Sequence, residues 1–337
     1  MRRLFVIAAV ALQVLALAFL AGDREWILRT GTPVVLRTAP IDPRDLFRGD
    51  YVRLRYDASV VPFTRTDASI IEQTKQGLYG RTVYAALAVG DDGLAEVTGL
   101  AAARPAAGLF LKGRTMMPWR FGIIAQDSVA VGYGIEAYYV QEGAGREIEK
   151  RQGTRTTVQT PLEMEVAVGG NGTAVIRGYR WSPLGIGLEA VESVRSGDAT
   201  GRKSAKLRLT LQNTSERPLA IVNLPGMCSL VLEPAGGSTA VRVPARQECA
   251  GRSPADADVV LLQPNDARAF DIDLAEPLWQ VFKDNAMVET GTLAWGERFR
   301  IVYRPPSREA TAALRDAPLI WHGSLPSRAF HGRGNID

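Results

Sequence analysis

The sequence predicts a mainly β protein with an N-terminal transmembrane helix, a mixed, mostly β domain with one short helix, and then a β-sandwich domain of immunoglobulin-like architecture. Three observations predict this: an apolar N-terminal run, many short segments in which apolar and polar residues alternate, and 33 glycines and 19 prolines scattered between them. Alternation with a period of two is typical of half-buried strands, and glycine and proline mark turns. At 337 residues the chain suits two domains, which we place at 26–181 and 186–337, after an anchor at 1–25.

The N-terminus favours a membrane anchor. Arg2 and Arg3 precede an apolar run over residues 4–22, which only Gln13 interrupts. About 19 residues at about 1.5 Å each span about 28 Å, close to the roughly 30 Å core of a bilayer. The paired arginines predict a single-pass inner-membrane protein with a short cytoplasmic start and its bulk in the periplasm or outside the cell. A cleaved signal peptide has the same basic start and apolar centre, so it remains an alternative, ahead of a buried core helix.

Composition argues against several classes of function. The net charge of +4 comes from interspersed charges, and the basic stripe with aromatics that is typical of nucleic-acid binders is not found. The only histidines are His322 and His331, and the only cysteines are Cys228 and Cys249. We therefore expect that the protein binds no nucleic acid. We also expect no metal and no cofactor, because zinc sites and histidine-based catalysis need denser clusters of these residues. In an oxidising compartment the cysteines can form a disulfide; the alternative is two separate buried thiols.

In the first domain, one helix and several strands are expected. Residues 66–78 form the best helix, with Thr66 or Asp67 as its cap. A hairpin over 163–179 turns at 169–172, where glycine and asparagine accept the positive φ of a tight turn. The remaining strands are expected at 34–37, 51–56, 82–89, 108–112 and 134–140.

The second domain shows the same alternation. Leu207, Leu209 and Leu211 share one face of the clearest strand. About seven short strands with turns between them suggest a sandwich of immunoglobulin-like architecture. The clearest of these strands are at 206–212, 220–224, 229–232, 259–262, 269–274 and 298–303.

The most distinctive segment covers residues 40–56. It contains Gly49, Asp50, Tyr51, Leu54 and Tyr56 with the spacing Gly-Asp-Tyr-x-x-Leu-x-Tyr, and related fragments follow at 111–114 and 133–143. Over about residues 1–180 the chain resembles the bacterial membrane-anchored family named for this GDYXXLXY motif. The resemblance implies membrane association, but no established activity or catalytic residues.

The motif has a structural and a recognition interpretation. Gly49 permits a turn that a side chain would block, and Asp50 can cap backbone N–H groups or pair with Arg44 or Arg48. Alternating aspartates and arginines favour a salt-bridge network, and the arginines oppose a calcium site. If the segment is a recognition surface, its residues are Arg44, Asp45, Arg48, Gly49, Asp50, Tyr51, Leu54 and Tyr56, joined by Lys112 and Tyr138.

We expect a non-catalytic binding or scaffolding module of the cell envelope. Its partners would be the membrane, through residues 4–22, and a polytopic inner-membrane protein or a periplasmic protein. One alternative is a relative of the signal peptidases: Lys112 fits the base, but Ile41 stands where the serine nucleophile is expected. Another is a sandwich that binds glycan or peptide through Trp279, Trp295 and Trp321, although tryptophans in a sandwich more often belong to the core.

Overall fold

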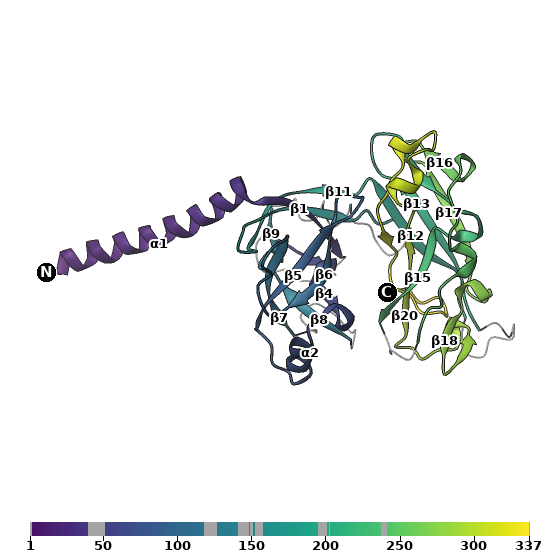
Figure 1. Ribbon diagram of the computed structural model, residues 1–337, viewed down its shortest axis with the longest axis horizontal. Coiled ribbons are helices and arrows are strands. Elements are labelled where there is room, and N and C mark those ends of the chain that lie inside the picture. Colours follow the sequence, from purple (N-terminus) through teal and green to yellow (C-terminus); the bar gives the residue numbers. More distant parts are fainter. Residues whose placement is uncertain are drawn as a thin grey trace.

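The structure is a computed structural model. It describes residues 2–39, 51–117, 127–140, 148, 151, 158–194, 201, 203–236 and 241–336. A long helix, α1 (Arg2–Thr30), projects from a body built almost entirely of strands, and the C-terminal part of the body lies on the side away from α1 (Figure 1). The predicted mainly β class with an N-terminal apolar helix is confirmed.

The apolar side chains of helix α1 are exposed. Phe5, Leu12 and Phe19 are 74%, 70% and 75% exposed, and no part of the most apolar stretch of the helix is buried in the protein. Within the described ranges, Phe5–Thr30 is the one helical segment long and apolar enough to cross a membrane, judged by length and composition.

The N-terminal part of the body contains two antiparallel sheets and a strand pair. Its core takes Leu36 and Met164 from one sheet, Leu111 and Val129 from the other, and Ile70 from α2 (Ala68–Lys75). The first sheet has the order β11 (Ala174–Trp181), β10 (Leu162–Val168), β1 (Thr32–Ala39), β3 (Arg55–Tyr56). The second has the order β4 (Val60–Pro62), β8 (Ser128–Gly132), β7 (Phe110–Met116), β5 (Thr82–Val89), β6 (Ala95–Ala101).

The predicted strand over 51–56 is divided between two partners. Its first half, β2 (Tyr51–Arg53), pairs with β9 (Ala137–Tyr139), whereas β3 continues the sheet beside β1. Leu54 lies at the break and donates its N–H to the carbonyl of Glu136 over 2.8 Å. The alternation was therefore interpreted correctly as extended backbone but wrongly as one uninterrupted strand.

The predicted helix over 66–78 is shorter in the structure. Asp67 stands at its N-cap position, but the Asp67 carboxylate accepts a hydrogen bond from the Ala102 N–H (3.1 Å) and makes no cap bond. Ile70 is buried, as its place on the apolar face predicted.

The C-terminal part of the body has a second core, which lies between two groups of strands. Leu209, Phe270, Leu232 and Phe299 are among its buried members. One sheet has the order β12 (Leu184–Glu192), β13 (Lys206–Asn213), β17 (Ala267–Asp273), and another has the order β15 (Leu230–Gly236), β20 (Arg298–Tyr303), β21 (Leu325–Pro326). The shorter elements are β14 (Leu219–Val222), β16 (Val259–Leu262), β18 (Val281–Lys283), β19 (Ala286–Val288) and α4 (Arg308–Thr311).

The two cores draw on different parts of the chain. The N-terminal core takes residues from Val34 to Ala174, and the C-terminal core takes residues from Leu184 to Phe330. Only residues 182 and 183 separate β11 from β12. The domain limits at 181 and 186 and the immunoglobulin-like topology stay predictions.

Candidate functional site

The structure describes the second half of the predicted motif surface. Tyr51 is described through the backbone of β2, and Leu54 and Tyr56 are described in full. Five predicted residues lie outside the described part of the chain: Arg44, Asp45, Arg48, Gly49 and Asp50. The geometry of the site is therefore built from Leu54, Tyr56 and their neighbours.

The pairing of β2 with β9 brings two distant fragments of the motif together. Tyr51 lies opposite Tyr139, and Val52 lies opposite Tyr138. Tyr138, which the sequence placed on the same surface, therefore lies beside the motif strand.

Leu54 and Tyr56 belong to the core. They are 2% and 0% exposed. The Tyr56 hydroxyl donates to the carbonyl of Ile135 over 2.7 Å. A motif tyrosine thus fastens the strand to a loop 79 residues further along the chain.

Tyr133 makes the reciprocal bond. Its hydroxyl donates to the carbonyl of Ala58 over 2.7 Å. The Glu136 carboxylate folds the intervening loop, because it accepts the N–H groups of Tyr133 (2.5 Å) and Gly134 (2.9 Å). Gly134 has φ +80°, a conformation that favours glycine. We call the two hydroxyl–carbonyl bonds, Tyr56–Ile135 and Tyr133–Ala58, the tyrosine clamp.

The clamp hydroxyls are held in their protonated form. Burial raises the pKa of Tyr56 and of Tyr133 far above the ordinary tyrosine value, and the nearby Glu136 carboxylate raises both further. Each hydroxyl is therefore a hydrogen-bond donor at any physiological pH. The described half of the motif is built as a structural fastening.

An aromatic row lies next to the clamp and is partly exposed. We define it as Tyr138, Tyr179 and Trp181, which meet edge to face with centroid distances of 5.8 Å and 6.1 Å. The guanidinium of Arg151 lies 4.8 Å from the Trp181 ring centre. Tyr139, beside the row on β9, is 80% exposed. This row is the accessible face of the motif region and had no signal in the sequence beyond Tyr138.

Lys112 does not join the clamp. It is exposed on β7 between the buried residues Leu111 and Gly113. Tyr133 lies against Gly113, where an added Cβ would approach the tyrosine ring to 3.0 Å. Because successive residues of a strand point to opposite faces, Lys112 points away from Tyr133.

A buried ion pair, which no sequence pattern predicts, lies at the junction between the two parts of the body. Arg37 on β1 and Glu163 on β10 are 8% and 2% exposed, and Arg37 Nη2 lies 3.2 Å from Glu163 Oε1. Arg180 contacts the other carboxylate oxygen over 2.8 Å. Arg37 also donates to the carbonyl of Ser324, so this ion pair reaches the C-terminal part of the body.

A second polar contact crosses the same junction. The Asp91 carboxylate accepts the N–H of Arg308 over 3.0 Å, and the Asp91 carbonyl accepts the Arg308 guanidinium over 3.1 Å. Gln159 and Ile186 add two backbone hydrogen bonds of 2.8 and 2.9 Å. These contacts hold the two parts of the body together.

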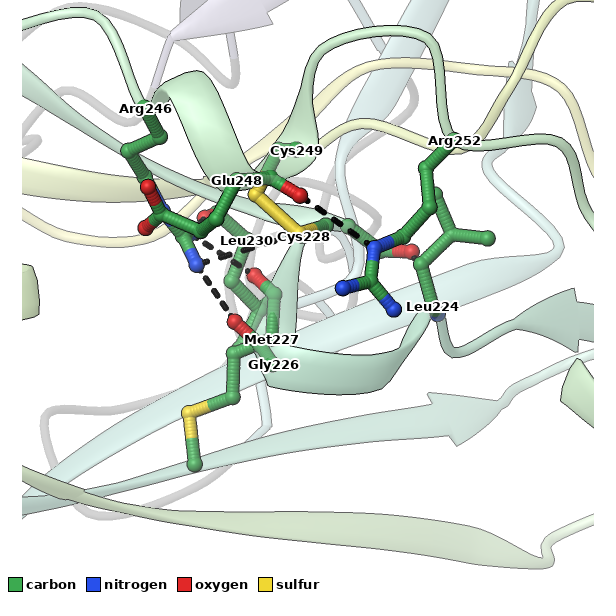
Figure 2. Close-up of a disulfide and its surroundings, with 10 residues drawn as sticks. Leu224, Gly226, Met227, Cys228, Leu230, Arg246, Glu248, Cys249 and Arg252 are labelled. Atoms are coloured by element: carbon green, nitrogen blue, oxygen red, sulfur yellow. Dashed lines mark hydrogen bonds and ion pairs between the residues drawn. A yellow bond between two sulfur atoms is a disulfide. The ribbon is translucent and has the colours of Figure 1, made fainter.

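Cys228 and Cys249 form a disulfide in the C-terminal part of the body (Figure 2). Arg246 supports the same loops, because its guanidinium donates to the carbonyls of Met227 (3.0 Å) and Leu230 (2.9 Å) and to that of Gly226 (Figure 2). The disulfide joins two loops, and Arg246 adds polar links between them.

The three tryptophans of the glycan or peptide interpretation have different surroundings. Trp279 is 1% exposed and belongs to the core, whereas Trp295 is 53% exposed. Trp321 packs against Tyr303 with a centroid distance of 6.0 Å. A buried Trp279 cannot contact a ligand, so the three do not line one groove.

The two serines near the motif have different surroundings. Ser59 is completely buried and accepts the Tyr56 N–H over 3.4 Å, and Ser69 is exposed on α2. Within the ranges that the structure describes, no group of three or more histidine, cysteine, aspartate or glutamate residues is arranged to hold a metal ion.

Fold and site together define a β-rich protein with a projecting apolar N-terminal helix and a tyrosine-fastened motif. The family model for GDYXXLXY proteins matches residues 13–178. The chain belongs to the GDYXXLXY family over this region. The comparisons with curated proteins and with solved structures return no match.

Proposed function

We propose that this chain is a membrane-tethered, non-catalytic protein of the bacterial cell envelope, whose body binds a membrane or periplasmic partner. One observation carries the proposal: α1 stands clear of the body with its apolar side chains exposed. Leaving such a surface in water is costly, at about 25 cal/mol for each Å². A bilayer is the environment that removes this cost for a helix of this length.

Two further observations support an exported body. Arg2 and Arg3 precede the apolar run over residues 4–22, and paired basic residues favour a cytoplasmic N-terminus. The Cys228–Cys249 disulfide is of the kind that persists in oxidising compartments such as the periplasm. We place the body in the periplasm, with an immunoglobulin-like sandwich over residues 186–337.

The recognition surface that we propose is the motif region. The tyrosine clamp holds the strand pair β2–β9 on the core, and the aromatic row remains partly accessible beside it. Aromatic side chains are enriched in protein interfaces because they bury a large area at little entropic cost. We propose a protein partner for this face.

Fractionation with site-directed crosslinking tests the proposal. The chain should stay with membranes after alkaline carbonate washing, and protease added to spheroplasts should digest the body. A photo-crosslinker at Tyr179, which is 39% exposed in the aromatic row, should capture one reproducible protein, and the same group at Met287, which is 43% exposed, should not. Release of the chain by carbonate would refute the tether, and identical products from both positions would refute the recognition surface.

A further inference from the structure

The last turn of α1 is fixed to the body without a flexible linker. Ile27 is 4% exposed, and an added Cβ at Gly169 would approach Ile27 Cγ1 to 3.1 Å. The carbonyl of Leu28 accepts the guanidinium of Arg177 on β11. Gly31 alone connects α1 to β1, and an added Cβ there would lie 2.6 Å from the Ile27 carbonyl oxygen.

This attachment sets the height of the body above a membrane that holds residues 4–22. The helix continues over residues 23–30, which adds about 12 Å at about 1.5 Å for each residue. The headgroup layer of one leaflet takes up about 5–7 Å of this distance. The turn between β10 and β11, which contacts Ile27, therefore stands within reach of the headgroups.

Three basic residues lie at this turn or beside the end of α1. Arg104 donates to the carbonyl of Gly170 over 2.8 Å, and the Lys112 N–H donates to the carbonyl of Gly172 over 2.8 Å. Arg104, Lys112 and Arg177 are all exposed. No ion pair between residues that the structure describes engages any of the three, whereas Arg29 on α1 is paired with Glu25. We call Arg104, Lys112 and Arg177 the juxtamembrane basic patch.

We propose that the juxtamembrane basic patch binds the anionic lipid headgroups of the leaflet in which α1 ends, and so orients the body on the membrane. The inference rests on the membrane tether proposed above. Charge and height both favour lipid, because exposed cations without acidic partners at headgroup level attract anionic lipid. Trp26, 68% exposed on α1, lies at the same level, where interfacial tryptophans are enriched.

The test uses the full chain in nanodiscs of phosphatidylcholine, with or without phosphatidylglycerol. A fluorophore on Asn171→Cys reports contact at the turn, since the native cysteines are joined in a disulfide and do not react. Spin-labelled headgroups should quench it more strongly in the anionic discs, and added salt should remove the difference. Each basic residue should raise the equilibrium constant for contact between the patch and anionic headgroups about fivefold.

A charge-matched control separates local contact from net charge. The variant R104Q/K112Q/R177Q should abolish the lipid dependence, and R242Q/R268Q/K283Q, in the C-terminal part of the body, should retain it. The effect of salt on quenching in the chain with the juxtamembrane basic patch intact is a second readout. It does not depend on how the triple variant folds. Equal quenching in both discs, or equal loss in both triple variants, would overturn the inference. A chain that fails to enter the discs would refute the tether itself.

Discussion

The Tyr56 hydroxyl lies 2.7 Å from the carbonyl oxygen of Ile135, and this bond joins the end of the GDYXXLXY motif to a loop far along the chain. The last tyrosine of the motif is completely buried. Its role is therefore to fasten the motif strand to the core, and the partner contact that we propose falls to the exposed aromatic neighbours.

Removing the Tyr56 hydroxyl should destabilise the protein while the aromatic ring still fills its place in the core. We expect Tyr56→Phe to lower the free energy of unfolding by about 1–2 kcal/mol, since it removes the buried donor to the Ile135 carbonyl. Denaturant unfolding of the body measures this. Tyr179→Phe is the matched control and should stay within about 0.5 kcal/mol. Equal effects in both variants would show that the clamp adds no stability.

The buried Arg37–Glu163 pair should stabilise the junction between the two parts of the body. Glu163→Gln removes the carboxylate nearest Arg37 while nearly preserving shape. We expect a loss of about 3 kcal/mol, because the buried guanidinium then keeps only the longer, 4.0 Å contact with Asp92. Glu165→Gln, exposed on the same strand, should change stability by less than about 0.5 kcal/mol. Faster proteolysis between residues 181 and 186 in Glu163→Gln alone would locate the weakening at the junction; unchanged proteolysis would contradict this.

The disulfide should contribute measurable stability. It joins cysteines 21 residues apart, and the chain-entropy relation for a loop of this length gives about 3 kcal/mol. Cys228→Ser/Cys249→Ser should lower the unfolding free energy by this amount, and a reductant should lower that of the wild type but not that of the double variant. A reductant that leaves wild-type unfolding unchanged would contradict the assignment.

Both histidines should make the protein less stable in mild acid. Burial lowers the pKa of His331 and of His322 below the ordinary value. The unfolded chain, with histidine pKa near about 6.5, then binds protons more readily than the folded one. Stability should be constant above that pH and fall as the pH drops from about 6.5 toward the folded pKa values. His322→Gln/His331→Gln should remove the histidine part of this slope in pH-dependent unfolding; an unchanged slope would refute it.

The elements found from sequence are those with clear periodicity. Strand β5 (Thr82–Val89) has the predicted limits, and the hairpin of β10 and β11 turns where glycine and asparagine predicted. Strand β8 (Ser128–Gly132) was missed because its first four residues are all buried, so it is short, apolar and without alternation. Periodicity carries no signal for a strand covered on both faces.

The candidate site was only partly accessible to sequence reasoning. The motif identified the strand that carries Tyr56, and the fragment at 133–143 contained its partner Ile135. Arg37 and Glu163 were missed because charged residues are almost never fully buried unless they are paired. Arg37 and Glu163 are 126 positions apart in the chain, and no local sequence pattern reveals a contact at that separation.

The orientation of the body across the membrane is the central claim, and one labelling experiment tests it most directly. Met287 lies on β19 in the C-terminal part of the body and is 43% exposed, so Met287→Cys supplies a reactive thiol. A membrane-impermeant maleimide should label this variant in intact spheroplasts and leave the wild type unlabelled, because its cysteines are joined. Labelling only after lysis would place the body in the cytoplasm and contradict the proposed function.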